Sequence, residues 1–435
     1  MALDVIIRRT PERVFRADVA VLGGGPSGWI AALAAAKLGA RVLLVERFGF
    51  LGGTATAGLV TPIGGFFAHM GNEDIIGGLP RQFVDRLAAL GGAKLPPYRE
   101  AYDPWQGSIY FDPEAYKYLA DQLLAEAGVT VLFHTWACGL DMHGYRVGRI
   151  HLMSKAGIQT AEANAFVDAT GDGDLIAWAG LPHDDDIVQA GTTIIRIAGI
   201  DEERAHRAGD PTGVFQAANR RLLERWGIRV PWGHRPGAGV NPGERVYNVT
   251  RLLNVDALDN ASLTRAEIEG RRQAREVLEV LRETHPGFER AYIAQTSVHV
   301  GIRCSRRLAG EYRITQEDAL SCRRFDDAVA RCSWPIDVHN PAGLGTKLVF
   351  LPENGSFTIP MRSLYHRNAA NLVTCGRTLS ATVEAHGSAR IGATCMGTGQ
   401  AAGVLAALMS KTGRWNGEVP ASEVQAVLRS WGTPV

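Results

Sequence analysis

DVAVLGGGPSGWIAALAAAKLGARVLLVE (residues 18–46) is the stretch that decides the fold of this chain. Its apolar run at 19–22 predicts a short buried parallel strand, and 41–45 predicts a second one. The alanine-rich residues 29–38 between them predict a helix that Gly39 ends. The order strand, helix, strand is that of a dinucleotide-binding unit.

Three glycines in this stretch have the spacing G-x-G-x-x-G: Gly23, Gly25 and Gly28. The first allows a tight turn, the second lets the backbone approach a pyrophosphate, and the third lets helix and strand pack closely. Free N–H groups at the helix start hold phosphate charge. Glu46, at the end of the second strand, is placed to bind a ribose. A tight turn without a ligand is the alternative, and it does not explain Glu46.

The composition bounds the class of protein. The 435 residues are 46% hydrophobic, which is enough for the cores of two domains. Lys plus Arg number 46 against 45 Asp plus Glu, a net charge of +1, so neither a nucleic acid nor a membrane surface is the expected partner.

The six cysteines show no C-x-x-C pair and no ligand-like spacing. We therefore expect no disulfide scaffold, no metal site and no iron–sulfur cluster. The charged start, 1–16, is not a signal peptide, and no run approaches the ~18 apolar residues of a membrane span. These features favour a cytoplasmic protein without a membrane span, and they leave a homo-oligomer open.

Periodicity predicts further elements along the chain: a helix at 112–128, strands at 129–133, 147–153 and 165–169, and a small-residue helix at 394–408. A long helix is expected at 264–284, opened by a capping box of Thr264 and Glu267.

The stretch 181–357 is richer in charge, proline and tryptophan than its flanks. The predicted fold class is α/β, a discontinuous Rossmann-type FAD-binding domain with an inserted α+β substrate or cap domain. The expected division is 1–180 and 358–435 for the first domain and 181–357 for the insert.

Several motifs carry a family resemblance over nearly the whole chain: LGGTAT (51–56), VDATGDGD (167–174), 303–311, NLVTCGR (371–377) and 384–403. In this order they resemble the FAD-dependent oxidoreductases of the glutathione-reductase superfamily. More narrowly, they are similar to a bacterial family that has one FAD domain with an inserted substrate cap.

The resemblance implies FAD as the cofactor and names residues near it. The loop with Gly53 and Thr54 is expected along the pyrophosphate and isoalloxazine. Trp136 and Ala137 lie where relatives contact the adenine through backbone groups. For Trp136 the alternative is an ordinary residue of the hydrophobic core. The full set of expected cofactor-binding residues is Gly23, Gly25, Pro26, Ser27, Gly28, Glu46, Arg47, Gly53, Thr54, Ala137, Gly171, Asp172, Gly376, Arg377, Thr394 and Met396.

The segment HGSARIGATCM (386–396) is similar to the H-G-x-N-R-L-G-x-N-S-L stretch of fumarate reductases and succinate dehydrogenases. There the arginine, here Arg390, binds a substrate carboxylate beside the flavin. Helix N–H groups around 394–396 can stabilise negative charge on a reduced flavin. Gly397 and Gly399 follow no strand and indicate close helix packing.

The chain departs from its relatives at two positions. Ala389 replaces the asparagine of that stretch, so the likeness does not fix the substrate. Arg377 stands where many relatives have an acidic residue that binds the ribityl chain.

The candidate catalytic residues are His386, Arg390, His299, Arg303 and His339. An imidazole can take the proton that accompanies hydride transfer, and arginines suit an anionic substrate. Each also has a structural alternative. Arg306 and Arg307 can pair with Glu311 or Asp318, and His299 can be a satisfied core residue.

These residues predict an FAD-dependent oxidoreductase that transfers a hydride between flavin N5 and a small, anionic organic substrate. One alternative is a flavin monooxygenase: Asp172-Gly173 resembles the D-G motif of such hydroxylases, but Arg377 contradicts their G-D segment at the ribityl chain. Others are an electron-transfer subunit, which usually carries cysteine clusters, and a flavoprotein whose cap binds a partner. The substrate and the electron acceptor stay open.

Overall fold

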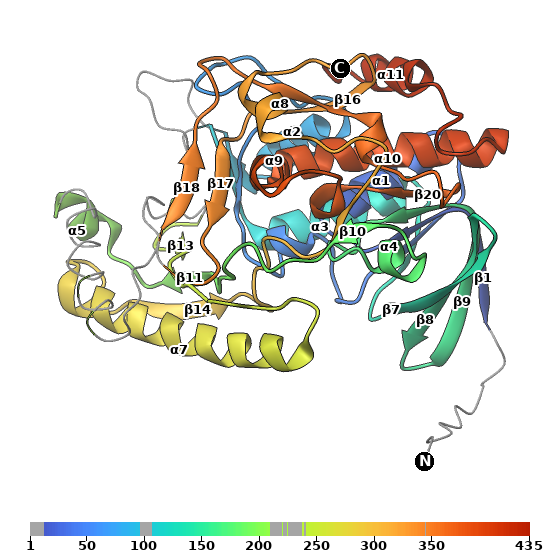
Figure 1. Cartoon of the computed structure of the whole chain (residues 1–435). Helices are drawn as coiled ribbons and strands as arrows, with labels where there is room; N and C mark the ends of the chain where they lie inside the picture. The colour runs from blue at the N-terminus through green and yellow to red at the C-terminus, as the bar shows by residue number, and fades with distance from the viewer. Residues whose placement is uncertain are drawn as a thin grey trace.

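The computed structural model describes residues 13–95, 107–208, 220, 224, 237–238, 241–343 and 345–435. It contains a large α/β body and a smaller lobe, which lies at the lower left in Figure 1. The α/β class predicted from the sequence is confirmed.

The body is built on one sheet in the order β6-β2-β1-β9-β8-β7, with β20 also paired to β9. Its parallel strands are β6 (Thr130–Leu132), β2 (Val42–Val45), β1 (Val14–Leu22), β9 (Gly157–Asp168) and β20 (Leu372–Thr374). Val21 lies opposite Leu44 on one side and Val167 on the other. The sheet therefore joins the start of the chain to a segment that follows the inserted region.

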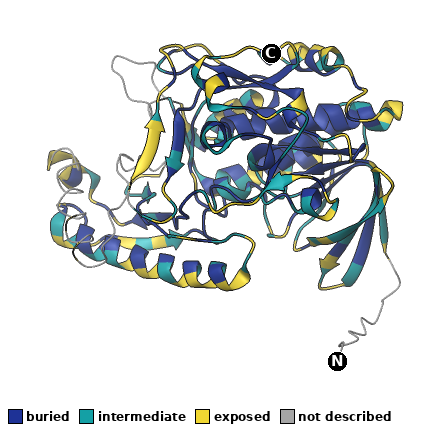
Figure 2. Cartoon of the chain, in the orientation of Figure 1, coloured by how far each residue is buried: buried dark blue, intermediate teal, exposed yellow. Residues whose placement is uncertain are grey.

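Two helices, α1 (Pro26–Lys37) and α10 (Gly392–Thr412), pack side by side in the body and are mostly buried (Figure 2). A Cβ atom at Gly399 would overlap the carbonyl of Ser27, and one at Gly403 would overlap that of Ala31. The close helix packing expected at Gly399 is confirmed. Only residues without side chains allow the two backbones to approach this closely.

An antiparallel meander of β7 (Trp136–His143), β8 (Arg146–Ser154) and β9 extends the sheet. The helix before it, α3 (Pro113–Glu126), begins after Asp112, whose carboxylate accepts a hydrogen bond from Glu114 N–H. Trp136 is 52% exposed, so the alternative that made it a core residue is wrong.

The lobe has its own small sheet, in the order β12 (Gly237–Ala238), β13 (Arg245–Tyr247), β11 (Ile195–Ala198), β14 (Tyr292–Thr296). The long helix α7 (Asn260–Thr284) covers it along the outer side of the lobe (Figure 1). Ile195 and Ile197 of the sheet share a buried cluster with Leu278 of the helix.

The start of α7 differs from the prediction. Asp259 caps the helix by accepting from the N–H groups of Ala261 and Ser262. Thr264 lies one turn inside and donates its hydroxyl to the carbonyl of Asn260, while Glu267 accepts from Val300 N–H. The Thr264–Glu267 capping box is therefore wrong, because an aspartate just upstream caps the helix first.

Residues 328–360 return to the body. The strands β16 (Ala328–Cys332) and β19 (Phe357–Pro360) form a pair, and β16 packs against α10. Between β16 and β19 in the chain lies a hairpin of β17 (Ile336–His339) and β18 (Thr346–Val349). Its strand β17 contacts α9 (Val383–Ala389). The predicted insert, 181–357, thus includes segments that pack on the first domain, and its limits stay a prediction.

The remaining elements are η1 (Gly53–Ala55), β3 (Pro62–Ile63), α2 (Leu79–Ala89), β4 (Ala93–Lys94), β5 (Ile109–Phe111), α4 (Asp174–Trp178), β10 (His183–Asp184), α5 (Glu202–Arg207), β15 (Arg307–Leu308), α8 (Gln316–Leu320), η2 (Met361–Ser363), η3 (Gly376–Thr378) and α11 (Ala421–Ser430). In the described ranges no single helix combines the length and apolar character of a membrane span; the bent pair α9–α10 does so by composition alone.

Candidate functional site

The glycine turn between β1 and α1 is packed so tightly that its outer glycines accept no side chain. Gly23 has a φ of 101°, and a Cβ there would overlap the carbonyl of Ala169. A Cβ on Gly28 would overlap the carbonyl of Gly23. Both glycines therefore do the structural work expected of them in a dinucleotide turn.

Gly25 differs, because the space before it is open. A Cβ atom built on Gly25 meets nothing within 4 Å, although this residue is the N-cap of α1 and Pro26 follows at the first helical position. Gly25 has no side chain that could cap the first N–H groups of the helix. The open space beside a helix N-terminus fits the phosphates of a dinucleotide.

Glu46 lies at the end of β2 and is 5% exposed. Its Oε2 accepts from Gly24 N–H at 2.7 Å, and its Oε1 accepts from Phe48 N–H at 2.8 Å. Burial raises the pKa of this carboxyl, against the effect of those hydrogen bonds. Glu46 thus braces the glycine turn, and its contact with a ribose stays a prediction. Arg47 is exposed and lies over the Phe48 ring at 4.9 Å.

The loop before η1 lies directly on the glycine turn. Gly52 N–H donates to the carbonyl of Gly24 at 2.9 Å, and a Cβ on Gly53 would come within 2.9 Å of Gly25 Cα. Thr54 lines the cavity described below. This packing agrees with the prediction that the loop lies beside the glycine turn, where the dinucleotide is expected to bind.

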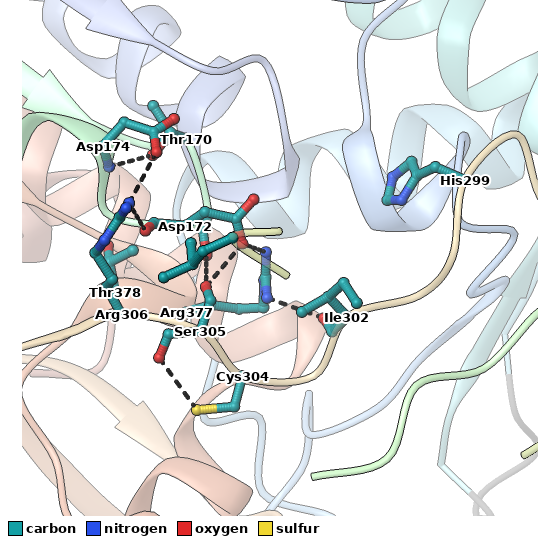
Figure 3. A network of polar contacts seen from close by, with 12 residues as sticks. Thr170, Asp172, Asp174, His299, Ile302, Cys304, Ser305, Arg306, Arg377 and Thr378 are labelled. Atoms are coloured by element: carbon teal, nitrogen blue, oxygen red, sulfur yellow. Dashed lines mark hydrogen bonds and ion pairs between the residues drawn. The ribbon is translucent and has the colours of Figure 1, made fainter. Parts of the chain in front are cut away.

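Asp172 and Arg377 join the loop after β9 to the loop after β20 (Figure 3). Arg377 Nη2 donates to Asp172 Oδ1 at 3.0 Å, and Ser305 Oγ donates to the same oxygen at 2.7 Å. Burial by itself would raise the pKa of Asp172, but the charge of Arg377, the hydrogen bond from Ser305 and the charge of Arg47 together hold it below its ordinary value. Arg377 Nη1 also donates to the carbonyl of Ile302 at 2.9 Å, which ties the segment before β15 to this end of the sheet.

Glycines with positive φ lie at both of these strand ends. Gly171 has a φ of 79°, and a Cβ there would come within 2.8 Å of Arg377 Nη2. Gly376 has a φ of 70° and donates its N–H to Thr398 Oγ1 of α10 at 3.1 Å. A Cβ on Gly376 would come within 2.6 Å of Ser27 Oγ. The ends of β9 and β20 and the starts of α1 and α10 therefore meet in one place.

The free donors of α10 lie slightly earlier than predicted. Cys395 N–H donates to the carbonyl of Ile391 at 2.8 Å, so the unpaired N–H groups of the first turn belong to residues 391–394. Met396 lines the cavity. Thr394 is fully buried.

A cavity of about 170 Å³ lies between the body and the lobe. One water needs roughly 10–15 Å³ of such space, so the cavity is large enough for part of an organic ligand. Pro26, Thr54 and Met396 line it from the body. Thr192, Ile194, Val246 and Asn248 line it from the region of the lobe.

Four charged or titratable groups meet at one wall of the cavity: Arg303, Asp337, His339 and Arg390. Arg390 Nη2 lies 3.3 Å from Asp337 Oδ2, and His339 Nε2 lies 3.1 Å from Asp337 Oδ1. Burial would raise the pKa of Asp337, but His339 and the two arginines hold it below its usual range. Burial, followed by the charge of Arg303, lowers the pKa of His339 to about 4.

Two of the predicted catalytic histidines are not in the cavity lining. His386 is fully buried, and its Nε2 lies 2.8 Å from the carbonyl of Arg377. Burial, then Arg307 and Arg390, hold its pKa well below the usual value. His299 stacks on Phe48 at 5.4 Å and lies apart from the contacts drawn around Asp172 in Figure 3. Of the three histidines, His339 lines the cavity.

Arg306 and Arg307 have structural partners, but not the predicted ones. Arg306 pairs with Asp174 at 3.1 Å, and Arg307 pairs with Asp184 at 3.2 Å. Glu311 and Asp318 pair with Arg367 and Arg323 instead. The predicted structural role of the two arginines agrees with these ion pairs, but the predicted partners are wrong. The actual partners are distant in the chain, whereas the prediction chose acidic residues close in sequence.

Asp337 was absent from the expected site residues. It lies two positions before His339 on β17, and side chains two apart in a strand point to the same face. That alternation was the available signal. Gln189 was also missed; its Oε1 accepts from Arg390 Nη2 at 3.3 Å, and no local pattern announces this contact between distant segments.

The sequence model of one protein family, described as FAD-dependent oxidoreductase, matches residues 18–428. A stretch of 37 residues, 8% of the chain, is 57% identical to dihydrolipoyl dehydrogenase of Trypanosoma brucei brucei and covers 8% of that enzyme. The chain thus aligns with less than a tenth of the length of this curated relative.

Two solved structures resemble the whole chain more loosely. A geranylgeranyl bacteriochlorophyll reductase-like protein from Thermoplasma acidophilum is 13% identical, with a TM-score of 0.48 over 96% of this chain and 84% of that one. The OxyS anhydrotetracycline hydroxylase from Streptomyces rimosus is 12% identical, with a TM-score of 0.47 over 96% of this chain and 66% of that one.

Proposed function

The chain belongs to the FAD-dependent oxidoreductase family, and from this premise we propose that it transfers a hydride between flavin N5 and a small anionic organic substrate. It is an oxidoreductase with FAD as its cofactor. The observation that carries the proposal is the shared cavity: Met396, from the start of α10, and His339, from β17, line the same space.

Several groups of this chain would hold the FAD. The open space before Gly25 would take the phosphates, and the free N–H groups at 391–394 would face the flavin ring. Asp172, held by Arg377 at 3.0 Å, would lie beside the ribityl chain, which the resemblance places near Arg377. The bound FAD supplies a two-electron acceptor and donor.

His339 is our candidate for the group that handles the substrate proton. A substrate that gives up a hydride from carbon also loses a proton from a neighbouring oxygen or nitrogen. His339 has a pKa of about 4, so it is a neutral imidazole at neutral pH and can accept that proton.

A hydrogen-bonded path leads from this imidazole to the surface. Asp337 Oδ1 lies 3.1 Å from His339 Nε2, and Thr346 Oγ1 lies 3.2 Å from His339 Nδ1. Thr346 is exposed on β18, whereas Asp337 and His339 line the cavity. Asp337 accepts from Nε2–H and so fixes the ring orientation, which leaves Nδ1 as the nitrogen that takes the substrate proton; from Nδ1 the proton can pass through Thr346 to solvent.

Anaerobic titration tests the proposal. The purified protein, with its FAD bound, is mixed in turn with acids, amines and sugars, and the flavin absorption is followed. We expect at least one anionic compound to bleach the flavin. If every panel member leaves it oxidised while dithionite reduces it, the chain does not act on such substrates.

The same preparation addresses the monooxygenase alternative. Oxygen uptake that is coupled to a hydroxylated product would favour that chemistry over simple hydride transfer. The residue that speaks against this alternative is Arg377, which stands where such hydroxylases carry the acidic residue of their G-D segment and which is paired with Asp172.

A further inference from the structure

Arg303 is a buried cation that the protein leaves largely unused. The residue is 9% exposed and lines the cavity. Its Nη1 donates to the carbonyl of Ala190 at 2.6 Å. Within the described ranges, no carboxylate forms an ion pair with it, although a guanidinium has five N–H donors.

The other arginines of the cavity differ in this respect. Arg377 is paired with Asp172 at 3.0 Å, and Arg390 with Asp337 at 3.3 Å. Both charges are therefore already compensated. Of the three described arginines that line the cavity, Arg303 is the one without an ion pair of its own; Asp337 attracts its charge from a greater distance but is itself paired with Arg390.

The surroundings increase the cost of this unpaired charge. Burial, followed by the repulsion of Arg390, lowers the pKa of Arg303 to about 9 against the attraction of Asp337, so Arg303 stays positive at neutral pH. Arg251 lies behind the wall, 2% exposed, where its Nη2 donates to the carbonyls of Asn340 and Gly345. A buried positive charge without an anion is unfavourable, and an anionic ligand removes that penalty.

The rest of the cavity wall is mostly apolar or neutral. Apolar side chains line it on several sides: Leu59, Val60, Ile194, Val246, Ile302 and Trp334. The neutral pair Thr192 and Asn248 is satisfied internally, because Thr192 Oγ1 donates to Asn248 Oδ1 at 2.8 Å. A ligand that fits this wall has an apolar body and one anionic group.

We propose that Arg303 binds the carboxylate of a monocarboxylic substrate whose apolar body lies against this wall. The inference rests on the proposed function and narrows its substrate class. The planar guanidinium matches the two oxygens of a carboxylate in a bidentate pair. With one uncompensated cavity arginine, a second carboxylate on the ligand would lack a partner of its own.

Matched probes test the assignment in the wild-type enzyme. The protein with bound FAD is titrated with acetate, butyrate, hexanoate and benzoate, and with the amide of each acid, while the flavin spectrum is recorded. We expect saturable shifts with the acids, tighter binding as the apolar part grows, and amides at least about 10-fold weaker. Equal binding of acids and amides would overturn the proposal, as would succinate binding more tightly than butyrate, or phenyl phosphate more tightly than benzoate.

Variants then assign the effect to Arg303. We expect Arg303→Met to weaken benzoate binding at least about 30-fold, without lowering the Tm of the ligand-free enzyme, because an unpaired buried charge is removed. Arg303→Lys keeps the charge but loses the two-pronged guanidinium, so its affinity for benzoate should lie between those of the wild type and of Arg303→Met. Arg282→Met is the control, since Arg282 also donates to a backbone carbonyl, that of Ala291, but lies outside the cavity lining.

Failure of the inference differs from failure of the proposed function. A protein without FAD, or one whose flavin no compound reduces, contradicts the proposed function. A reducible flavoprotein in which Arg303→Met and Arg303→Lys bind benzoate as the wild type does contradicts only the role of Arg303.

Discussion

Arg377 Nη2 lies 3.0 Å from Asp172 Oδ1, so the loop after β20 is tied by charge to the loop after β9. The two strands are parallel neighbours, and ligands of open α/β sheets bind at the carboxyl ends of such strands. The resemblance predicts an acidic residue after β20, but this chain has Arg377 there, and its nearest charged partner is Asp172 in the loop after β9.

The pair should be tested by substitution at both positions. The side chains of Arg377 and Asp172 are 15% and 18% exposed. Arg377→Met leaves a carboxylate largely buried without its partner, so we expect the free energy of unfolding to fall by about 3 kcal/mol and FAD to dissociate more readily. The double variant Asp172→Asn with Arg377→Met should recover part of the stability. Urea unfolding and FAD fluorescence measure both effects; a double variant no more stable than the single one would show that the charges are not coupled.

Gly25→Val should give colourless protein. Gly25 has φ −66° and ψ −177°, an extended conformation that valine adopts without strain, and its Cβ position is free of protein atoms. The new side chain therefore fills the space intended for the phosphates while the fold is kept. Absorbance at the flavin band, with circular dichroism for the fold, is the measurement.

Gly139→Val provides the matched control for this substitution. Gly139 lies in β7, where a Cβ meets His151 at an ordinary 3.6 Å. We expect this variant to stay yellow. Should the Gly25 variant also keep its flavin spectrum, the assignment of the glycine turn to FAD is wrong.

The local parts of the fold could be predicted from the sequence, because their signals lie within one segment. The strand, glycine turn and helix of residues 18–46 need only apolar spacing and the φ freedom of Gly23, and both are present in the structure. The cap of α7 was predicted wrongly because Thr264 and Glu267 satisfy the same local rule as Asp259. Local rules do not rank competing caps.

The charged wall of the cavity could be predicted only in part. Arg303, His339 and Arg390 were singled out by residue type, and all three line the cavity. His386 was singled out in the same way, yet it is fully buried against the carbonyl of Arg377. Which side chains face a cavity depends on the packing of distant elements, and a sequence motif does not contain that information.

Replacement of the cavity imidazole should slow the chemical step. His339→Gln keeps a polar side chain beside Asp337 but removes the proton acceptor, so we expect flavin reduction by substrate to slow by about 100-fold or more, with FAD still bound. His299→Gln is the comparison, because His299 lies outside the cavity lining. Anaerobic stopped-flow absorbance measures the rate. If the His299 variant loses the rate and the His339 variant keeps it, the proton acceptor has been assigned to the wrong histidine.

Arg390→Leu should retain FAD and lose substrate turnover. The side chain holds Asp337 through its Nη2 and is 10% exposed, so its loss frees the carboxylate that orients His339. Arg331→Leu is a suitable control: Arg331 is also 10% exposed and ion-paired, with Glu73 at 2.6 Å, but lies outside the cavity lining. Steady-state kinetics of the two variants decide the matter, and unaltered kcat in Arg390→Leu would remove this arginine from the active site.

The depressed pKa of His339 predicts a pH dependence of stability that the His339→Gln variant should lack. In the native protein this pKa is about 4, below the ordinary 6.5, because burial and then the charge of Arg303 disfavour the imidazolium. Between these values the unfolded chain binds more protons at this residue than the native protein does. The contribution of His339 to stability is therefore complete above pH 6.5 and is lost as the pH falls towards 4.

We expect the wild type to lose up to about 3 kcal/mol of unfolding free energy relative to the His339→Gln variant between pH 6.5 and pH 4. Titrating groups that do not contact His339, such as Asp174 with a pKa of about 6, are common to both proteins and cancel in the difference. Urea unfolding of both proteins at several pH values measures it, and parallel curves would mean that His339 titrates normally in the folded protein.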